Sequence, residues 1–170
     1  MHHRASLLVV IILLTLTGCG GSEPQALTNA AGKYKLLMPG SPKSQTEAAA
    51  GMTMHIQSYE ERDGAFMVMY VDAPIPANES EAQIQARLDG SRNGALANVK
   101  GKLISESQIK LADKYHGREF RGEITKPQGV IVTRIYLVGG RLYQVMALGN
   151  PSWVDRDVIK KCLGSFELLP

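Results

Sequence analysis

The feature that most constrains the fold is a pair of glycines between two apolar runs. The runs are Val130 to Val138 (VIVTRIYLV) and Arg141 to Leu148 (RLYQVMAL), and Gly139-Gly140 alone separates them. Both runs are rich in β-branched, aromatic and aliphatic residues, which is typical of strands. Glycine adopts positive φ angles without a Cβ clash, as tight hairpin turns require. The pattern therefore predicts an antiparallel hairpin.

Further segments with strand patterns lie on both sides of this hairpin. Met52 to Tyr59 alternates apolar and polar residues, which indicates a half-buried strand. Ala65 to Val71 (AFMVMYV) is apolar on both faces, so we expect a central strand that is covered on both sides. The other predicted strands are Lys33 to Met38, which Pro39-Gly40 ends, Lys102 to Leu111 and Tyr115 to Ile124.

Two segments have helical patterns instead. Ser80 with Gln83 resembles a capping box, so a helix is predicted from Ser80 to about Val99. Asn150-Pro151 opens a final helix that Gly164 ends. Strands, a helix, four strands and a helix in this order predict an α+β fold: an antiparallel β-sheet flanked by two main helices, in a single domain over residues 33–170.

The first eighteen residues have the pattern of an export signal. A short basic start ends at Arg4, and Leu7 to Leu16 is an apolar run of ten residues. Spanning a bilayer takes about 20 apolar residues, so this run fits the core of a signal peptide over residues 1–18. It ends in Leu16-Thr17-Gly18-Cys19, which resembles the lipobox of bacterial lipoproteins. An ordinary signal peptide with an incidental cysteine is the alternative.

The lipobox resemblance implies that Cys19 is lipidated and becomes the mature N-terminus. The protein would then be anchored in the cell envelope, on the extracytoplasmic side. Gly20 is not the aspartate that retains such lipoproteins in the inner membrane, so an outer-membrane destination stays open if the source is a diderm bacterium. Gly20 to Gly32 (GGSEPQALTNAAG) is small and polar, and residues 19–32 are interpreted as the lipidated N-terminus and a flexible tether.

Three segments of the predicted domain resemble the PsbP-like superfamily and its small bacterial envelope relatives. They are Tyr34 to Lys43 (YKLLMPGSPK), Gly139 to Val145 (GGRLYQV) and Ile159 to Phe166 (IKKCLGSF). The resemblance implies an antiparallel sheet flanked by helices and, usually, a non-catalytic accessory role. Cys162 stands where a bulky apolar residue is expected, a departure that bears on helix packing more than on function.

Residues that could carry chemistry are few. His55 and His116 do not have metal-ligand spacing, and we expect no metal and no cofactor. Cys162 is interpreted as a small buried hydrophobe, because no neighbouring base would activate it as a nucleophile. The alternative of an enzyme would rest on His116 with Glu119 or Arg118. We expect no enzyme.

Basic residues gather in the second half of the chain, where acidic residues interleave with them. The mixture favours a solvated strand face over an anion-binding or membrane-facing patch, because mixed charges cancel at range. The chain has 19 Lys and Arg against 16 Asp and Glu, so nucleic acid is not an expected partner. The basic residues are Lys110, Lys114, Arg118, Arg121, Arg134 and Arg141, and the acidic ones Glu106, Asp113, Glu119 and Glu123.

Three functions remain open from the sequence. The favoured one is a lipid-anchored binding or accessory module that presents a sheet surface to an envelope protein or glycan. A carrier with a cleft between sheet and helices for an apolar or amphiphilic ligand is the alternative. An enzyme is the third.

Overall fold

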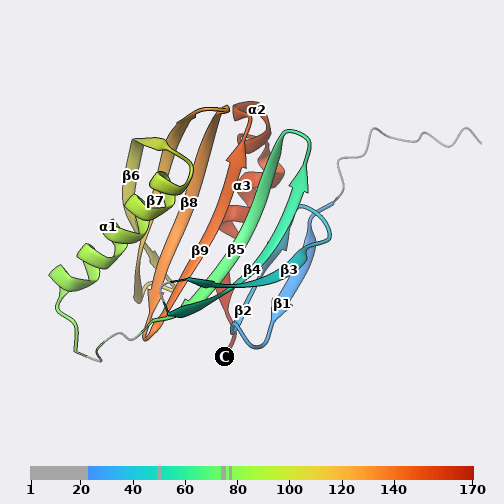
Figure 1. Cartoon of the computed structure of the whole chain (residues 1–170). Coiled ribbons are helices and arrows are strands. Elements are labelled where there is room, and N and C mark those ends of the chain that lie inside the picture. The colour runs from blue at the N-terminus through green and yellow to red at the C-terminus, as the bar shows by residue number, and fades with distance from the viewer. Residues whose placement is uncertain (1–22, 50, 74–75, 77) are drawn as a thin grey trace, which may run out of the picture.

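The computed structural model describes residues 23–49, 51–73, 76 and 78–170. Over these residues the chain forms a seven-stranded antiparallel sheet, a three-stranded antiparallel sheet and helices on both faces of the larger sheet (Figure 1). The predicted α+β fold is therefore confirmed. The predicted signal peptide, Cys19 and residues 20–22 of the predicted tether lie outside the described residues.

The large sheet contains every strand that the sequence predicted except the first. Val138 pairs with Arg141 across Gly139, whose φ is 56°, so the hairpin that the two glycines predicted is present. The strand order is β3 (Lys43–Ala49), β4 (Met52–Glu61), β5 (Gly64–Asp72), β9 (Arg141–Gly149), β8 (Gln128–Val138), β7 (Tyr115–Thr125) and β6 (Gly101–Leu111).

The small sheet corrects the predicted tether. Its order is β1 (Gln25–Asn29), β2 (Tyr34–Met38) and β10 (Glu167–Leu168). Residues 25–29 were expected to be a flexible linker, but Gln25 pairs with Met38 and Asn29 with Tyr34 in an antiparallel ladder. Leu27 also packs against the core. The folded unit therefore includes residues before Lys33, where the domain was expected to begin.

Three helices are described: α1 (Glu81–Asn98), α2 (Pro151–Val154) and α3 (Asp157–Gly164). The Ser80–Gln83 capping box is formed, and the Asn150 side chain accepts from the Ser152 amide. The predicted final helix is wrong in one respect, because it is two helices. Arg156 has an extended backbone, with ψ 141°, and begins α3 in a new direction. The break lets Trp153 of α2 and Ile159 of α3 both reach the core.

Two hydrophobic clusters lie on opposite faces of the large sheet. The first joins β5, β8 and β9 to the small sheet, α2 and α3, and it includes Phe66, Val68 and Tyr143. The second lies under α1 and includes Leu88, Phe120 and Ile131. The prediction that β5 is a central strand covered on both sides is confirmed for one side and holds in part for the other: Phe66 and Val68 are fully buried, whereas on the opposite side Val71 is buried and Met67 and Met69 are half-buried. The contacts of α1 are with β6, β7 and β8, so the helix does not extend over β5.

Candidate functional site

The histidine and its two suggested partners do not meet at one place. Successive residues of a strand point to opposite faces, so His116 and Arg118 face α1 while Glu119 faces the other side of the sheet. His116 Nε2 lies 3.1 Å from a carboxylate oxygen of Glu81, at the start of α1. Glu119 instead accepts a hydrogen bond from Arg134 of β8. The structure thus separates His116 from Glu119.

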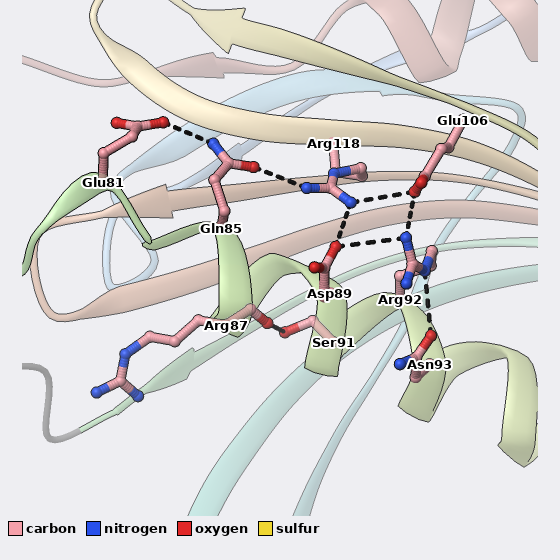
Figure 2. Close-up of polar contacts among 9 residues, drawn as sticks. All are labelled: Glu81, Gln85, Arg87, Asp89, Ser91, Arg92, Asn93, Glu106 and Arg118. Atoms are coloured by element: carbon pink, nitrogen blue, oxygen red, sulfur yellow. Dashed lines mark hydrogen bonds and ion pairs between the residues drawn. The ribbon is translucent and has the colours of Figure 1, made fainter. Parts of the chain in front are cut away.

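Arg118 is the centre of a polar network between α1 and the sheet (Figure 2). Its guanidinium donates to Asp89 and, over 2.7 Å, to the Gln85 side chain, both on α1. It also donates over 3.1 Å to Glu106 of β6. Arg92 of α1 contacts the same two carboxylates, Asp89 at 3.3 Å and Glu106 by a hydrogen bond. Two arginines and two carboxylates therefore balance in charge.

The network is partly removed from water. The Arg118 side chain is only 7% exposed, against 44% for Asp89 and 35% for Glu106. Hydrogen bonds from Arg92 and then Arg118 outweigh burial and hold the pKa of Glu106 below its usual value. Arg118 Nε is buried without a partner. Arg118 was expected on a solvated strand face, and that expectation is wrong because α1 covers it.

The α1 half of this network was not predicted from the sequence. Glu81, Gln85, Asp89 and Arg92 follow one another at spacings of four, four and three residues, so they share one side of the helix. This polar stripe runs beside the apolar residues that were used to predict the helix. A polar stripe next to an apolar one is the signal that would have identified α1 as a helix facing both a core and a charged strand.

The remaining arginines of the predicted basic group are paired one by one. Arg121 makes a bidentate contact with Asp155 at 2.9 and 3.0 Å, and Arg141 makes one with Asp72 at 2.6 and 2.8 Å. These hydrogen bonds lower the pKa of both aspartates. Since Arg118 and Arg121 face opposite sides of β7, the arginines do not form one patch. The mixed-charge interpretation fits this arrangement.

Cys162 and His55 belong to packed regions. Cys162 is fully buried in the first hydrophobic cluster, and burial raises the pKa of its thiol to about 11. Its interpretation as a small buried hydrophobe is confirmed. His55 stacks on the Tyr70 ring, with ring centroids 4.6 Å apart. Among the described residues, no group of three or more His, Cys, Asp or Glu side chains is arranged to hold a metal ion.

A hollow of about 680 Å³ lies at one end of the large sheet. Its walls come from the β4–β5 turn, the β7–β8 turn, the end of α1 and the end of β9. The lining is mixed. Its apolar members are Ala65, Val99, Ile124, Pro127 and Leu148, and its charged members are Glu60, Glu61, Arg62, Asp63, Lys100 and Lys126. Its size is in the range of small-molecule sites, although such sites are lined mainly by apolar groups and this lining carries six charged residues.

None of the helices that the structure describes is long and apolar enough to cross a membrane. The chain matches no protein-family model and no curated protein. Among solved structures, the chain is similar to the solution structure of cyanobacterial PsbP (CyanoP) from Synechocystis sp. PCC 6803. The TM-score is 0.58 at 14% sequence identity, and the match covers 92% of this chain and 98% of the other. This similarity shows a PsbP-like fold.

Proposed function

We propose that the protein is a lipid-anchored, non-catalytic binding or accessory module of the bacterial cell envelope. The observation that carries the proposal is the Leu16-Thr17-Gly18-Cys19 motif at the end of a ten-residue apolar run. A sulfur that carries acyl chains holds a protein durably only when two or more chains are attached. Cys19 is the attachment residue, and an envelope protein or glycan is the proposed partner.

The arrangement of polar groups supports a binding role. Arg118, Arg121 and Arg141 each pair with carboxylates of the same chain, so their charges are balanced within the domain. A rigid sheet with internally balanced charge suits a surface that holds a partner. The PsbP-like fold is consistent with this role and does not by itself identify it.

The test is metabolic labelling of cells with a clickable fatty-acid analogue. We expect label on the wild-type protein and none on the Cys19→Ala variant, with Cys162→Ala as the control because Cys162 is buried. Equal label on the wild type and Cys19→Ala would refute lipidation of Cys19. Crosslinking in intact cells, followed by mass spectrometry, would then identify what the anchored form contacts.

A carrier of an apolar or amphiphilic ligand is the second candidate, and the hollow at the end of the sheet favours it. Its volume of about 680 Å³ and a lining that sets the apolar side chains of Val99, Ile124 and Leu148 beside charged ones suit a small amphiphilic ligand. Native mass spectrometry of the purified protein separates the two functions. A co-purifying small molecule supports the carrier. Loss of that molecule from the Ala65→Trp variant would place its binding site in the hollow, since Ala65 lines the hollow and a Trp side chain would fill part of it. A mass that matches the lipidated chain alone favours the binding module.

A further inference from the structure

The strand β1 sets how far the domain can lie from a lipid on Cys19. Glu23 is the first described residue, and it is four residues after Cys19. A fully extended chain spans about 3.3–3.6 Å per residue, so these four residues reach at most about 14 Å. This is less than the width of seven strands spaced by about 4.8 Å. A lipid on Cys19 would therefore hold one end of the domain at the bilayer.

The pairing of the strands identifies this end. Gln25 pairs with Met38, and the nearby Gly40 lies against the Tyr59 ring. Glu60 follows Tyr59 on β4. It begins a row of register partners that crosses the large sheet and ends at Leu103 of β6. The intermediate residues of the row are Ala65, Leu148, Ile131 and Gly122. The start of β1, the β4–β5 and β7–β8 turns and the start of β6 thus lie at one end of the molecule (Figure 1).

The β6 corner of this end exposes two neighbouring apolar side chains. Leu103 is 42% exposed and Ile104 is 56% exposed. The pairing of β6 with β7 shifts register between Leu103 and Ser105, so Ile104 is a bulge residue without a partner on β7. A bulge on an edge strand turns a side chain outward and opposes the addition of another strand. The exposed pair is therefore poorly suited to pairing with a second copy of the chain.

Three lysines lie at the same end of the molecule as the two apolar side chains. Lys100 and Lys102 lie just before them, and Lys126 lies in the β7–β8 turn at the same end. No ion pair joins these three lysines to a carboxylate in the part of the chain that the structure describes. Glu123, the register partner of Lys102, is the acidic residue of this corner, whereas Glu60 and Asp63 lie at the β4–β5 turn. The β6 corner is thus the basic part of the end.

We infer that this corner, formed by Leu103, Ile104, Lys100, Lys102 and Lys126, contacts the surface of an anionic lipid bilayer. Leu103 and Ile104 enter the boundary between headgroups and acyl chains, and the lysines contact the phosphates. The inference rests on the proposed lipid anchor. The apolar insertion and the lysine–phosphate attraction are each weak alone, and a short tether to the bilayer would make the contact of the corner with the lipid intramolecular. This contact would place the hollow at the end of the large sheet beside the lipid headgroups.

The test uses the full-length lipidated protein in vesicles of phosphatidylglycerol and phosphatidylethanolamine. Ile104→Cys is labelled with an environment-sensitive fluorophore, and Met52→Cys is the matched control. Met52 is 36% exposed and begins β4 at the opposite end of the sheet. Cys162 does not compete for the label because it is fully buried. We expect a blue shift at residue 104 and none at residue 52, and loss of most of the shift in Lys100→Gln/Lys102→Gln/Lys126→Gln.

Flotation of the vesicles separates the two possible failures. Protein that floats without a shift at residue 104 keeps the anchor and overturns the corner contact. An equal shift at residues 52 and 104, or an equal shift in neutral phosphatidylcholine vesicles, also overturns it. Protein that does not float, together with absence of fatty-acid label, overturns the lipid anchor itself and the corner contact that depends on it.

Discussion

At the scale of single residues, Arg118 is a charged residue in a buried position. It joins α1 to β6 through Asp89 and Glu106, and its side chain is almost fully buried. A buried charge is costly to leave unpaired, whereas an exposed ion pair adds little to stability. The arginine ion pairs of the sheet should therefore differ in what they contribute to stability.

We predict that Asp89→Asn/Glu106→Gln lowers the free energy of unfolding by about 1–3 kcal/mol, because it leaves the buried Arg118 guanidinium beside neutral groups, while the two carboxylates that it replaces are 44% and 35% exposed to water. Asp155→Asn is the control, since its partner Arg121 is 29% exposed, and it should cost no more than about 1 kcal/mol. Urea unfolding followed by circular dichroism measures both. Similar losses in the two variants would contradict a special role for Arg118.

The same carboxylates predict an acid-sensitive domain. Arginine hydrogen bonds lower the pKa of Glu106, Asp72 and Asp155 below their usual values of 4.5, 3.8 and 3.8. A pKa that is lower in the folded state means that stability is present above the unfolded pKa and is lost as the pH falls through the folded one. Urea unfolding at pH 7 and at stepwise lower pH should show this loss below about pH 4.5. Glu106→Gln should make the loss of stability with falling pH shallower. An unchanged slope of stability against pH would argue against a contribution from Glu106.

At the scale of elements, α1 has a well-capped N-terminus but residues of low helix propensity in its interior. Its capping box is complete, but Gly90 and Gly94 lie in its interior. A methyl group added at either glycine would meet no atom within 4 Å. The helix therefore carries the entropic cost of glycine without a packing reason for it. This makes α1 the element with most room for stabilisation.

We predict that Gly90→Ala and Gly94→Ala each stabilise the domain by about 0.5–1 kcal/mol. Gly64→Ala is the matched contrast, because its methyl group would collide with the Trp153 ring. The melting temperature, followed by circular dichroism, should rise for the two helix variants and fall for Gly64→Ala. A fall for the helix variants would indicate a contact that the exposed side of α1 makes elsewhere.

The elements also show what the sequence could reveal about fold and site. Apolar runs and turn residues identified β2, β4, β5, β7, β8 and β9, because those strands bury side chains, and β6 was also predicted although most of its residues are exposed. β1 and β3 were missed since their residues are mostly exposed, and strand pairing there leaves no hydrophobic pattern. The break between α2 and α3 depends on tertiary packing. Arg118 was named from the sequence, but its partners come from helix and strand positions that only the fold brings together.

At the scale of the whole molecule, the outcome for β1 changes the picture of the anchored protein. Residues 20–32 were expected to form a long tether, but β1 takes Gln25–Asn29 into the fold. A lipid on Cys19 would then leave only a short connection, so the domain would meet partners close to the bilayer. The length of this connection becomes a variable that experiments can change.

We predict that inserting about ten Gly and Ser residues after Gly21 leaves fatty-acid labelling and flotation intact but reduces the fluorescence shift at Ile104→Cys. A longer linker lowers the effective concentration of the corner at the membrane. An insertion of the same length in the β3–β4 turn, at Gly51, is the control, because Gly51 has open space around it. An unchanged shift with the longer tether would show that the corner binds the bilayer without help from the anchor.

The sealed position of Cys162 has a consequence for how the domain responds to redox conditions. At mildly acidic or neutral pH, a thiol with a pKa of about 11 stays protonated, and full burial denies it to oxidants and to other thiols. The domain should survive swings between reducing and oxidising surroundings without forming mixed disulfides or crosslinked aggregates.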